Sequence, residues 1–439
     1  MPAPQQLPNH PNLVNLRKRA KTLLIGWRAG QPTALARIAA WHPRARQLHE
    51  TGSSALADAQ LVVAREYGFG SWPSLVHHLR LEPQAQALHL MDRQFQATLP
   101  PIGGTATVGE VLGRRVELLR RGHRDGDPAA AGLLRAVGGA RGYDEIQRTG
   151  LTLPRARAAV AREHGFAGWD AAMVYRDEPV DPRFEAAVEA LVSGELDALR
   201  TLLDTDPALV TARSPFGHHA TLVHYVAANG IELSRQWQTP PNAAPILRTL
   251  LARGADPDAL CDTYGGGGAQ TPLCLLVSSR HPADAGVQAS LVEVLCRGGA
   301  SPDGLDDDGL PLWTAITWGY SPAVEALARC GARVDNVVFA AALGDLPAVR
   351  RHFDGDGYAA SNPARSGQRV GAHGPHLDPH HLTEYALIYA AGHNRRPVVE
   401  FLLGRNPDLD VSEPVFHSTA LGAARYHGFT EIVALLEAT

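Results

Sequence analysis

The sequence predicts an all-α protein: a solenoid of stacked helix pairs that follows a duplicated helical domain. One observation is a recurring segment, of which LVEVLCRGGASPD (291–303) and AVEALARCGARVD (323–335) align without a gap at an offset of 32 residues. Another is a pair of similar segments nearer the N-terminus, LVVAREYGFGSW (61–72) and AAVAREHGFAGW (158–169). A period near 33 residues is typical of stacked helical repeats, because one helix pair cannot bury its apolar face alone.

The duplicated domain is predicted to span residues 1–178, with its two units at about 12–82 and 105–178. Gly30 and Gly126 are expected to end a helix in each unit, because the residue that follows a helix often needs a positive φ. The proline two residues later suits the first turn of the next helix. Each unit is therefore predicted to hold a helix, a turn, a second helix, a loop and two more short helices.

A Gly-Phe-x-x-Trp motif lies near the end of each unit. Its aromatic residues are expected to be buried as core anchors: Phe69, Trp72, Phe166 and Trp169. The preceding Arg65 and Glu66 fit a solvated helix face, since charged side chains are seldom fully buried.

The solenoid is predicted to span residues 179–439, with about seven repeats and an insertion at 354–381. The inner helices begin with related segments: TLVHYVAANG (221–230), TPLCLLVSS (271–279), LPLWTAITWG (310–319) and STALGAARYHG (418–428). These segments resemble the Thr-Pro-Leu-His-x-Ala-Ala motif of ankyrin repeats, which implies an ankyrin-repeat α-solenoid. By this resemblance His224 is expected to form hydrogen bonds between repeats, whereas Cys274 and Trp313 stand at the same position in later copies.

The resemblance extends to the N-terminal domain, which is similar to a helical module found ahead of ankyrin repeats in bacterial proteins. It implies that the module caps the open end of the solenoid, which would otherwise expose apolar surface. It also implies that the loops between repeats form a shared site.

Composition limits the classes of function. The chain has 439 residues and a formal net charge of −4, so its overall charge favours neither nucleic acid nor an anionic membrane as a partner. The four cysteines lack metal-type spacing and are expected to be reduced. The polar, Pro-rich N-terminus does not resemble a signal peptide, and no apolar run has the ~20 residues that span a bilayer. A cytoplasmic protein is expected.

Candidate ligand contacts are the aromatic and histidine residues of the fingers, inner helices and insertion. They are Phe216, His218, His219, Tyr264, Trp313, Trp318, His376, His380, His381, Tyr385 and His417. For His218 and His219, a place in a ligand site and a place in a surface turn are equally compatible with the sequence. No catalytic residue can be assigned.

A metal or cofactor site is not expected. His373, His376, His380, His381 and Glu384 could bind zinc, but they match neither His-Glu-x-x-His nor its inverted form. The glycine run that begins at Gly265 matches neither the dinucleotide-binding nor the P-loop pattern.

Two functions remain open from the sequence. The first is a non-catalytic recognition scaffold that binds a protein or peptide on its concave face. The alternative is a small-molecule-binding protein or enzyme, hydrolytic or metal-assisted, with a His- and aromatic-lined site in the groove. That alternative requires the insertion at 354–381 to fold over the groove as a lid.

Overall fold

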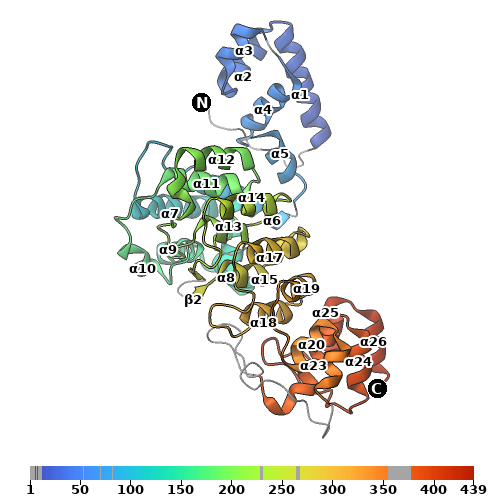
Figure 1. Ribbon diagram of the computed structural model, residues 1–439. Helices are drawn as coiled ribbons and strands as arrows, with labels where there is room; N and C mark the ends of the chain where they lie inside the picture. Colours follow the sequence, from blue (N-terminus) through green and yellow to red (C-terminus); the bar gives the residue numbers. More distant parts are fainter. Residues whose placement is uncertain are drawn as a thin grey trace. The chain divides into compact units, whose positions relative to one another are not determined.

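The computed structural model describes residues 5, 7, 12–52, 54–69, 71–81, 83–227, 231–263, 267–353 and 377–439. Its regular structure is almost entirely helical (Figure 1), and the two short strands β1 (Cys261–Thr263) and β2 (Gly267–Gln270) pair antiparallel. The predicted all-α class is therefore confirmed. Within the described ranges, no helix is both long enough and apolar enough to cross a bilayer.

The chain forms two compact units. Unit 1 comprises Met1–Arg93 together with Gly126–Leu133, and unit 2 comprises Gln94–Asp125 together with Leu134–Thr439. Most of the second helical copy, predicted at about 105–178, thus belongs to the same compact unit as the repeats. The domain boundary near residue 178 remains a prediction from the sequence pattern.

Unit 1 is built around a small helical core. Its helices are α1 (Leu13–Arg28), α2 (Pro32–Trp41), α3 (Ala45–Thr51), α4 (Leu56–Glu66), α5 (Trp72–His78) and most of α6 (Pro83–Gln96). Asn12 caps α1, since its side chain accepts a hydrogen bond from the Val14 amide at 2.7 Å. Leu16 and Leu23 of α1 are buried together with Val62 of α4 and form part of one apolar cluster.

The second helical copy has helices at matching places. They are α7 (Val108–Asp125), α8 (Pro128–Thr149), α9 (Leu153–Glu163) and α10 (Trp169–Val174). Helices α4 and α9 end in the same turn: the Phe69 amide donates to the Ala64 carbonyl and the Phe166 amide to the Ala161 carbonyl, both at 2.9 Å. The glycine before each phenylalanine has a φ of 76°, a left-handed conformation that favours glycine.

The core role predicted for the motif aromatics holds for only two of the four residues. Phe69 and Phe166 are buried, but Trp72 and Trp169 are only half-buried. The Arg157 guanidinium lies over the Trp169 ring, 5.2 Å from its centre, so this indole packs beneath a surface cation.

The solvated position predicted for Glu66 is wrong. Its side chain is buried and accepts two hydrogen bonds from the Arg37 guanidinium, at 2.5 and 2.6 Å. Two hydrogen bonds and the positive charge of one arginine compensate the desolvation of a buried carboxylate. Glu66 can therefore occupy an inward position of α4.

The repeats form seven helix pairs within the described residues. The pairs are α11 (Pro182–Val192) with α12 (Leu196–Thr205), α13 (Leu222–Ala227) with α14 (Ala243–Ala252), α15 (Pro272–Val277) with α17 (Gln288–Arg297), α18 (Leu310–Thr317) with α19 (Ser321–Arg329), α20 (Val337–Leu343) with α21 (Leu346–Arg351), α23 (Leu382–Gly392) with α24 (Arg396–Leu403), and α25 (Ala420–His427) with α26 (Thr430–Glu437). Short extra helices are η1 (Pro207–Val210), α16 (Arg280–Asp284) and η2 (Pro379–His381).

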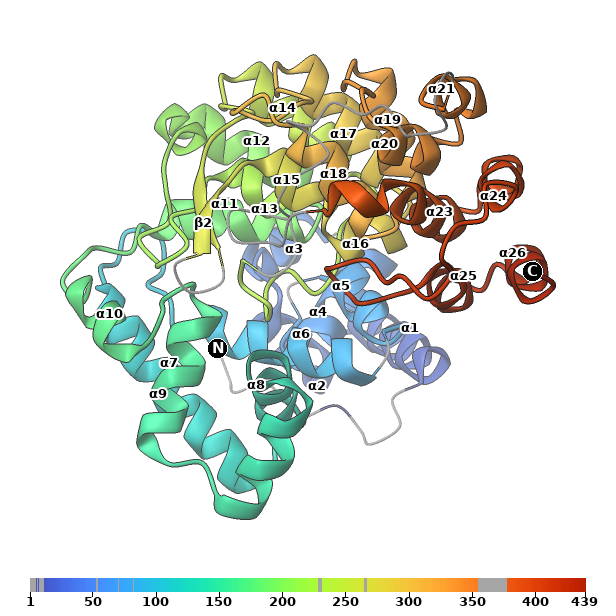
Figure 2. The same cartoon turned by 90° about the horizontal axis from the view of Figure 1, so that it is seen from below.

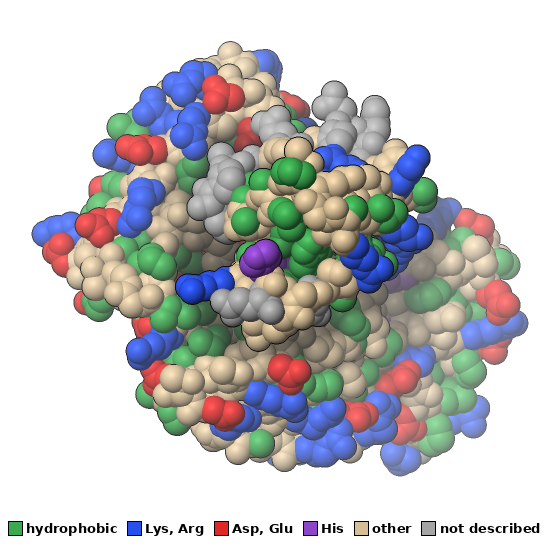
Figure 3. Space-filling view, turned by 90° about the horizontal axis from the view of Figure 1, so that it is seen from above, with side chains coloured by type: hydrophobic (Ala, Val, Ile, Leu, Met, Phe, Trp, Pro, Cys, Tyr) green, Lys and Arg blue, Asp and Glu red, His purple; other side chains and the backbone are tan. Residues whose placement is uncertain are grey.

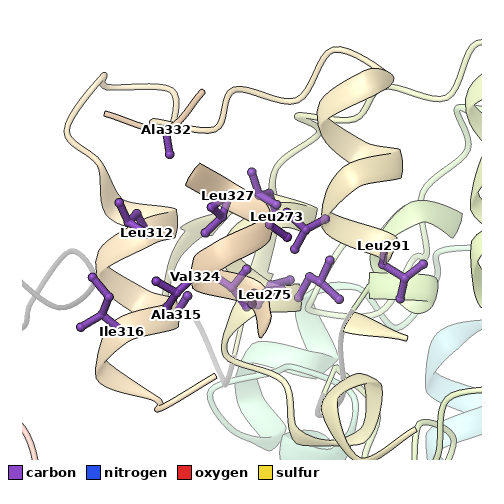
Figure 4. Packing of buried hydrophobic residues seen from close by; sticks show 14 of the residues in the cluster. Leu273, Leu275, Leu291, Leu312, Ala315, Ile316, Val324, Leu327 and Ala332 are labelled. Atoms are coloured by element: carbon purple, nitrogen blue, oxygen red, sulfur yellow. The ribbon is translucent and has the colours of Figure 1, made fainter. Parts of the chain in front are cut away.

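The first member of each pair packs on the first member of the next, so the pairs form an inner and an outer row (Figure 2). Figure 4 shows part of the shared core, in which Leu273 and Leu275 of the inner helix α15 lie close to Leu327 and Val324 of the outer helix α19. This is the solenoid that the 32-residue offset predicted.

Two motif residues have structural roles, and that of His224 is the one expected from the resemblance. The Thr271 side chain caps α15 by accepting a hydrogen bond from the Cys274 amide at 3.3 Å. His224 Nε2 lies 2.9 Å from the Ala259 carbonyl, at the start of the next repeat, and its Nδ1 lies 2.9 Å from Thr221 Oγ1. Burial lowers the pKa of His224 to about 4, so the ring is neutral and Nε2 donates.

Candidate functional site

A groove of about 1200 Å³ lies at the C-terminal ends of the inner helices of unit 2. It is bordered by the ends of α15, α18 and α25, by the extra helix α16, and by the starts of α17 and α19. Its lining includes Ser278, Arg280, Asp284, Trp318, Tyr320, Tyr426 and His427. The groove exceeds the roughly 300–1000 Å³ of sites that enclose a drug-sized ligand, so it favours an extended occupant.

Aromatic side chains at and beside the groove are exposed to solvent. Trp318 is 45% exposed, Tyr426 is 86% exposed and Phe416 is 54% exposed. The Phe416 ring packs edge-on against Trp318, with 5.4 Å between the ring centres. We call Trp318, Phe416 and Tyr426 the groove aromatics. Scattered exposed apolar residues need no explanation, but a cluster beside a groove is typical of a binding surface.

The charged groups of the groove are few and largely paired with each other. Arg280 and Asp284, one helical turn apart on α16, form an exposed ion pair at 3.0 Å. Burial raises the pKa of Tyr320 and lowers that of His427, so both rings are neutral at pH 7. The groove therefore presents apolar and hydrogen-bonding groups, and neither positive nor negative charge dominates its lining.

A tight contact fixes one wall of the groove. Gly319 has a φ of 76°, and a Cβ atom at this position would lie 2.5 Å from the His427 ring. Glycine therefore allows α25 to approach the end of α18, which places Tyr426 on the same groove as Trp318.

Comparisons with known proteins do not assign a function to the chain. Neither a protein-family profile nor a curated protein sequence matches the chain. Among solved structures, the ankyrin repeat domain of Bcl-3, titled a unique member of the IkappaB protein family, is 20% identical over 57% of this chain and 97% of its own. Its TM-score of 0.29 is too low to support an inference about function.

The predicted ligand contacts do not converge on one place. Trp318 lines the groove, and the exposed His417 follows Phe416 in the chain. Trp313 and Tyr385 are buried in the inner helices, and His380 and His381 belong to the turn η2. Tyr264, His376 and most of the insertion at 354–381 lie outside the described residues.

The two histidines predicted in the first finger have different environments. His219 is half-buried and lies 3.0 Å from the carboxylate of Asp262. His218 and Phe216 are fully buried, so in this structure neither is available to an external ligand.

His218 belongs to a buried cluster of ionisable side chains within unit 2. Its Nδ1 accepts a hydrogen bond from the Ala220 amide at 3.1 Å, and its Nε2 lies 3.1 Å from Glu232 Oε1. The Tyr225 hydroxyl donates to the same carboxylate oxygen at 2.7 Å. Although burial acts in the opposite direction, the charge of Arg235 and the His218 hydrogen bond hold the pKa of Glu232 well below its usual range.

Arg115, Glu163 and His164, which also belong to this cluster, come from the second helical copy. Arg115 of α7 lies 2.7 Å from His164 Nε2 and 5.2 Å from the centre of the Phe216 ring. Burial, together with the charge of Arg115, lowers the pKa of His164 well below its usual value. The Ser234 amide donates to Glu163 at 2.7 Å.

These contacts join the helical copy to the first repeats. A Cβ atom at Gly165 would lie 2.5 Å from the His218 backbone nitrogen, so the turn after α9 and the first finger are in close backbone contact. The segment after α13 contributes Glu232, Ser234 and Arg235, all buried. Strongly shifted pKa values also occur at active sites, but here the groups are buried among each other, which indicates a structural junction.

Glu163 should make stability depend on pH. Burial raises its pKa from 4.5 to about 7, so between these values the folded state binds more protons than the unfolded state. The wild-type protein should therefore lose stability as pH rises from about 4.5 to 7 and lose no more above it. Urea unfolding should show that Glu163→Gln gains about 2–3 kcal/mol relative to wild type between pH 5 and pH 8. Parallel pH profiles of the two proteins would contradict the assignment.

Of the groove aromatics, only Trp318 is predicted from the sequence. Tyr426 and Trp318 lie at or next to the last residue of an inner helix, a position that aligning the copies would have identified. Phe416 lies in a loop, where only packing decides exposure. No group of three or more His, Cys, Asp or Glu side chains among the described residues could hold a metal ion.

Proposed function

We propose that this chain is a recognition scaffold that binds a protein or peptide segment in the groove at the C-terminal ends of its inner helices. The observation that carries the proposal is the exposure of the groove aromatics beside that groove. Tyr and Trp dominate binding energy at protein interfaces, because they bury a large area and lose little side-chain entropy.

The packing around the groove supports a preformed site. Trp318 directly follows α18, whose Ala315 and Ile316 belong to the continuous core, and Tyr426 lies in α25, whose Ala424 belongs to the same core. A binding surface held by a packed core loses little conformational entropy when a partner binds. The absence of a dominant charge in the lining favours a partner segment with apolar side chains and backbone hydrogen bonds.

No specific observation favours a small-molecule enzyme. Of the residues that the alternative required, His218 and Trp313 are buried, and most of the insertion that would form the lid lies outside the described residues. The groove is also larger than a typical enclosed ligand site.

We also propose that the second helical copy caps the first repeat. The close contact between Gly165 and His218 and the hydrogen bond from Ser234 to Glu163 support this role. A capping element shields the apolar end of a repeat stack from water.

Removal of two groove aromatics should abolish tight peptide binding. Peptides selected from a random phage-displayed library on the wild-type protein should bind Trp318→Ser/Tyr426→Ser at least about 30-fold more weakly, because the loss of even one hot-spot aromatic costs about 2 kcal/mol of binding free energy. Fluorescence anisotropy of the labelled peptides measures the affinities.

The control is Val174→Ser/Leu305→Ser, which removes two other exposed apolar side chains that do not line the groove. It should bind the selected peptides like the wild type. Equal affinity of the wild type and the groove variant would refute the proposed site.

A further inference from the structure

The charges of this chain are unevenly distributed along the sequence. The first 49 residues hold eight of its 41 Arg and Lys residues and none of its 45 Asp and Glu residues. Both lysines of the entire chain, Lys18 and Lys21, lie in α1. The small overall charge of −4 therefore conceals a basic N-terminal region, and such asymmetry often marks a surface for an anionic partner.

The basic residues of α1 share one face of the helix. Val14, Lys18, Lys21, Ile25 and Arg28 follow each other at intervals of three or four residues, so they form a single stripe, beside which Arg17 lies. The opposite face contributes Leu16 and Leu23 to the core of unit 1. The stripe includes two of the most exposed aliphatic side chains in the described residues, Val14 at 69% and Ile25 at 67%. We call these six residues the α1 stripe.

The cations of the α1 stripe are not neutralised by nearby acids. The acidic residues of α4 are already engaged, since Glu66 pairs with Arg37 and Asp58 with His42. Among the described residues, Arg17, Lys18 and Lys21 have no ion-pair partner. Figure 3 shows a face on which Lys and Arg side chains border hydrophobic ones in the middle of the view, with no Asp or Glu among them.

We infer that the α1 stripe binds the surface of an anionic phospholipid membrane. The Lys and Arg side chains would pair with lipid phosphate and carboxylate groups, while Val14 and Ile25 would enter the boundary between headgroups and acyl chains. Cations interleaved with exposed aliphatic side chains on one helix face are typical of helices that lie in this boundary. The helix would rest on the membrane without crossing it.

The two aliphatic residues favour a membrane over nucleic acid. Nucleic acids are bound by cations together with aromatic or polar side chains that reach the bases, and the α1 stripe offers neither. An acidic protein would use the cations but would not require Val14 and Ile25. Because only two aliphatic side chains enter the bilayer, binding should be weak and dominated by charge, and salt should reduce it.

Vesicle flotation with the full chain tests this inference. At 0.1 M NaCl the wild-type protein should bind vesicles of phosphatidylcholine with 30% phosphatidylserine, and should not bind vesicles of phosphatidylcholine alone. Lys18→Gln/Lys21→Gln should lower the partition coefficient by about 25-fold, since each cation near an anionic surface contributes roughly a fivefold factor. Val14→Ser/Ile25→Ser should lower it by about 10-fold or more.

The matched control is Arg120→Gln/Arg121→Gln, which removes two exposed cations from another helix, α7. It should bind vesicles like the wild type, and circular dichroism should confirm that all variants are folded. Absence of binding to anionic vesicles would overturn the inference. Binding that the lysine variant loses but the Val14→Ser/Ile25→Ser variant keeps would overturn the placement of the two aliphatic side chains in the bilayer, because charge alone would then account for the binding.

Discussion

Arg235→Ala should lower the free energy of unfolding by about 3–5 kcal/mol, among the largest effects of any single substitution in this chain. Arg235 is 2% exposed, donates to Glu185 Oε2 at 2.6 Å, and lies 3.6 Å from Glu232 Oε2. Its removal leaves two buried carboxylates without their cation, and the desolvation of these charges is then uncompensated. Urea unfolding of the variant and the wild type at pH 7 measures the difference.

Arg253→Ala is the matched control, because Arg253 forms its ion pair with Asp204 at 2.8 Å on the surface. Exposed pairs contribute about 0–1 kcal/mol, so this variant should remain close to the wild type. Equal losses of stability in the two variants would mean that Arg235 does not compensate the buried charges of Glu185 and Glu232.

Trp313→Ala should lower the free energy of unfolding by about 3–5 kcal/mol. Trp318→Ala should lower it far less, even though the two tryptophans are only five residues apart in the sequence. Trp313 is 1% exposed and packs between Phe339 and Tyr389. The centre of its ring lies 6.2 Å from that of Phe339 and 5.2 Å from that of Tyr389. Trp318 is nearly half exposed, so its loss leaves no buried cavity. Thermal unfolding separates the variants.

The same pair separates stability from recognition. Trp318→Ala should bind selected peptides weakly while it keeps a melting temperature near that of the wild type. A large loss of stability in Trp318→Ala, or none in Trp313→Ala, would mean that their positions are assigned wrongly.

The repeat architecture could be predicted because its signal is local and periodic. Several inner helices carry their own capping residue, as Thr271 does for α15 and Thr419 does for α25, and the apolar pattern recurs at the helix spacing. His224 could be assigned a structural role for the same reason, since its partner Ala259 lies at a fixed distance in the next repeat.

The buried ionic cluster could not be predicted, because its partners are distant in sequence. Glu66 and Glu163 occupy equivalent places in the two copies, and both appear as solvated charges when only the local helix is considered. One is buried beside Arg37 and the other beside the Ser234 amide, so each has a different tertiary partner. Tertiary contacts of this kind override the usual preference of a carboxylate for water.

The groove was predicted only in part. Trp318 was identified from its residue type, but Tyr426 appeared as an ordinary residue of the last repeat, and His218 and Trp313 were expected at the groove although they are buried. Exposure depends on how far neighbouring helices separate at their ends, which the helix period does not encode. The charge of α1 was missed because a whole-chain average conceals a short acid-free segment.

Hydrogen–deuterium exchange with a bound peptide tests the proposed function most directly. Addition of a selected peptide should slow exchange at the ends of α15, α18 and α25 and in α16, because these segments form the groove. The outer helices α12 and α14, which do not line it, should exchange at unchanged rates. Protection confined to the outer helices or to unit 1, with none at Trp318 or Tyr426, would contradict the proposal that the groove is the recognition site.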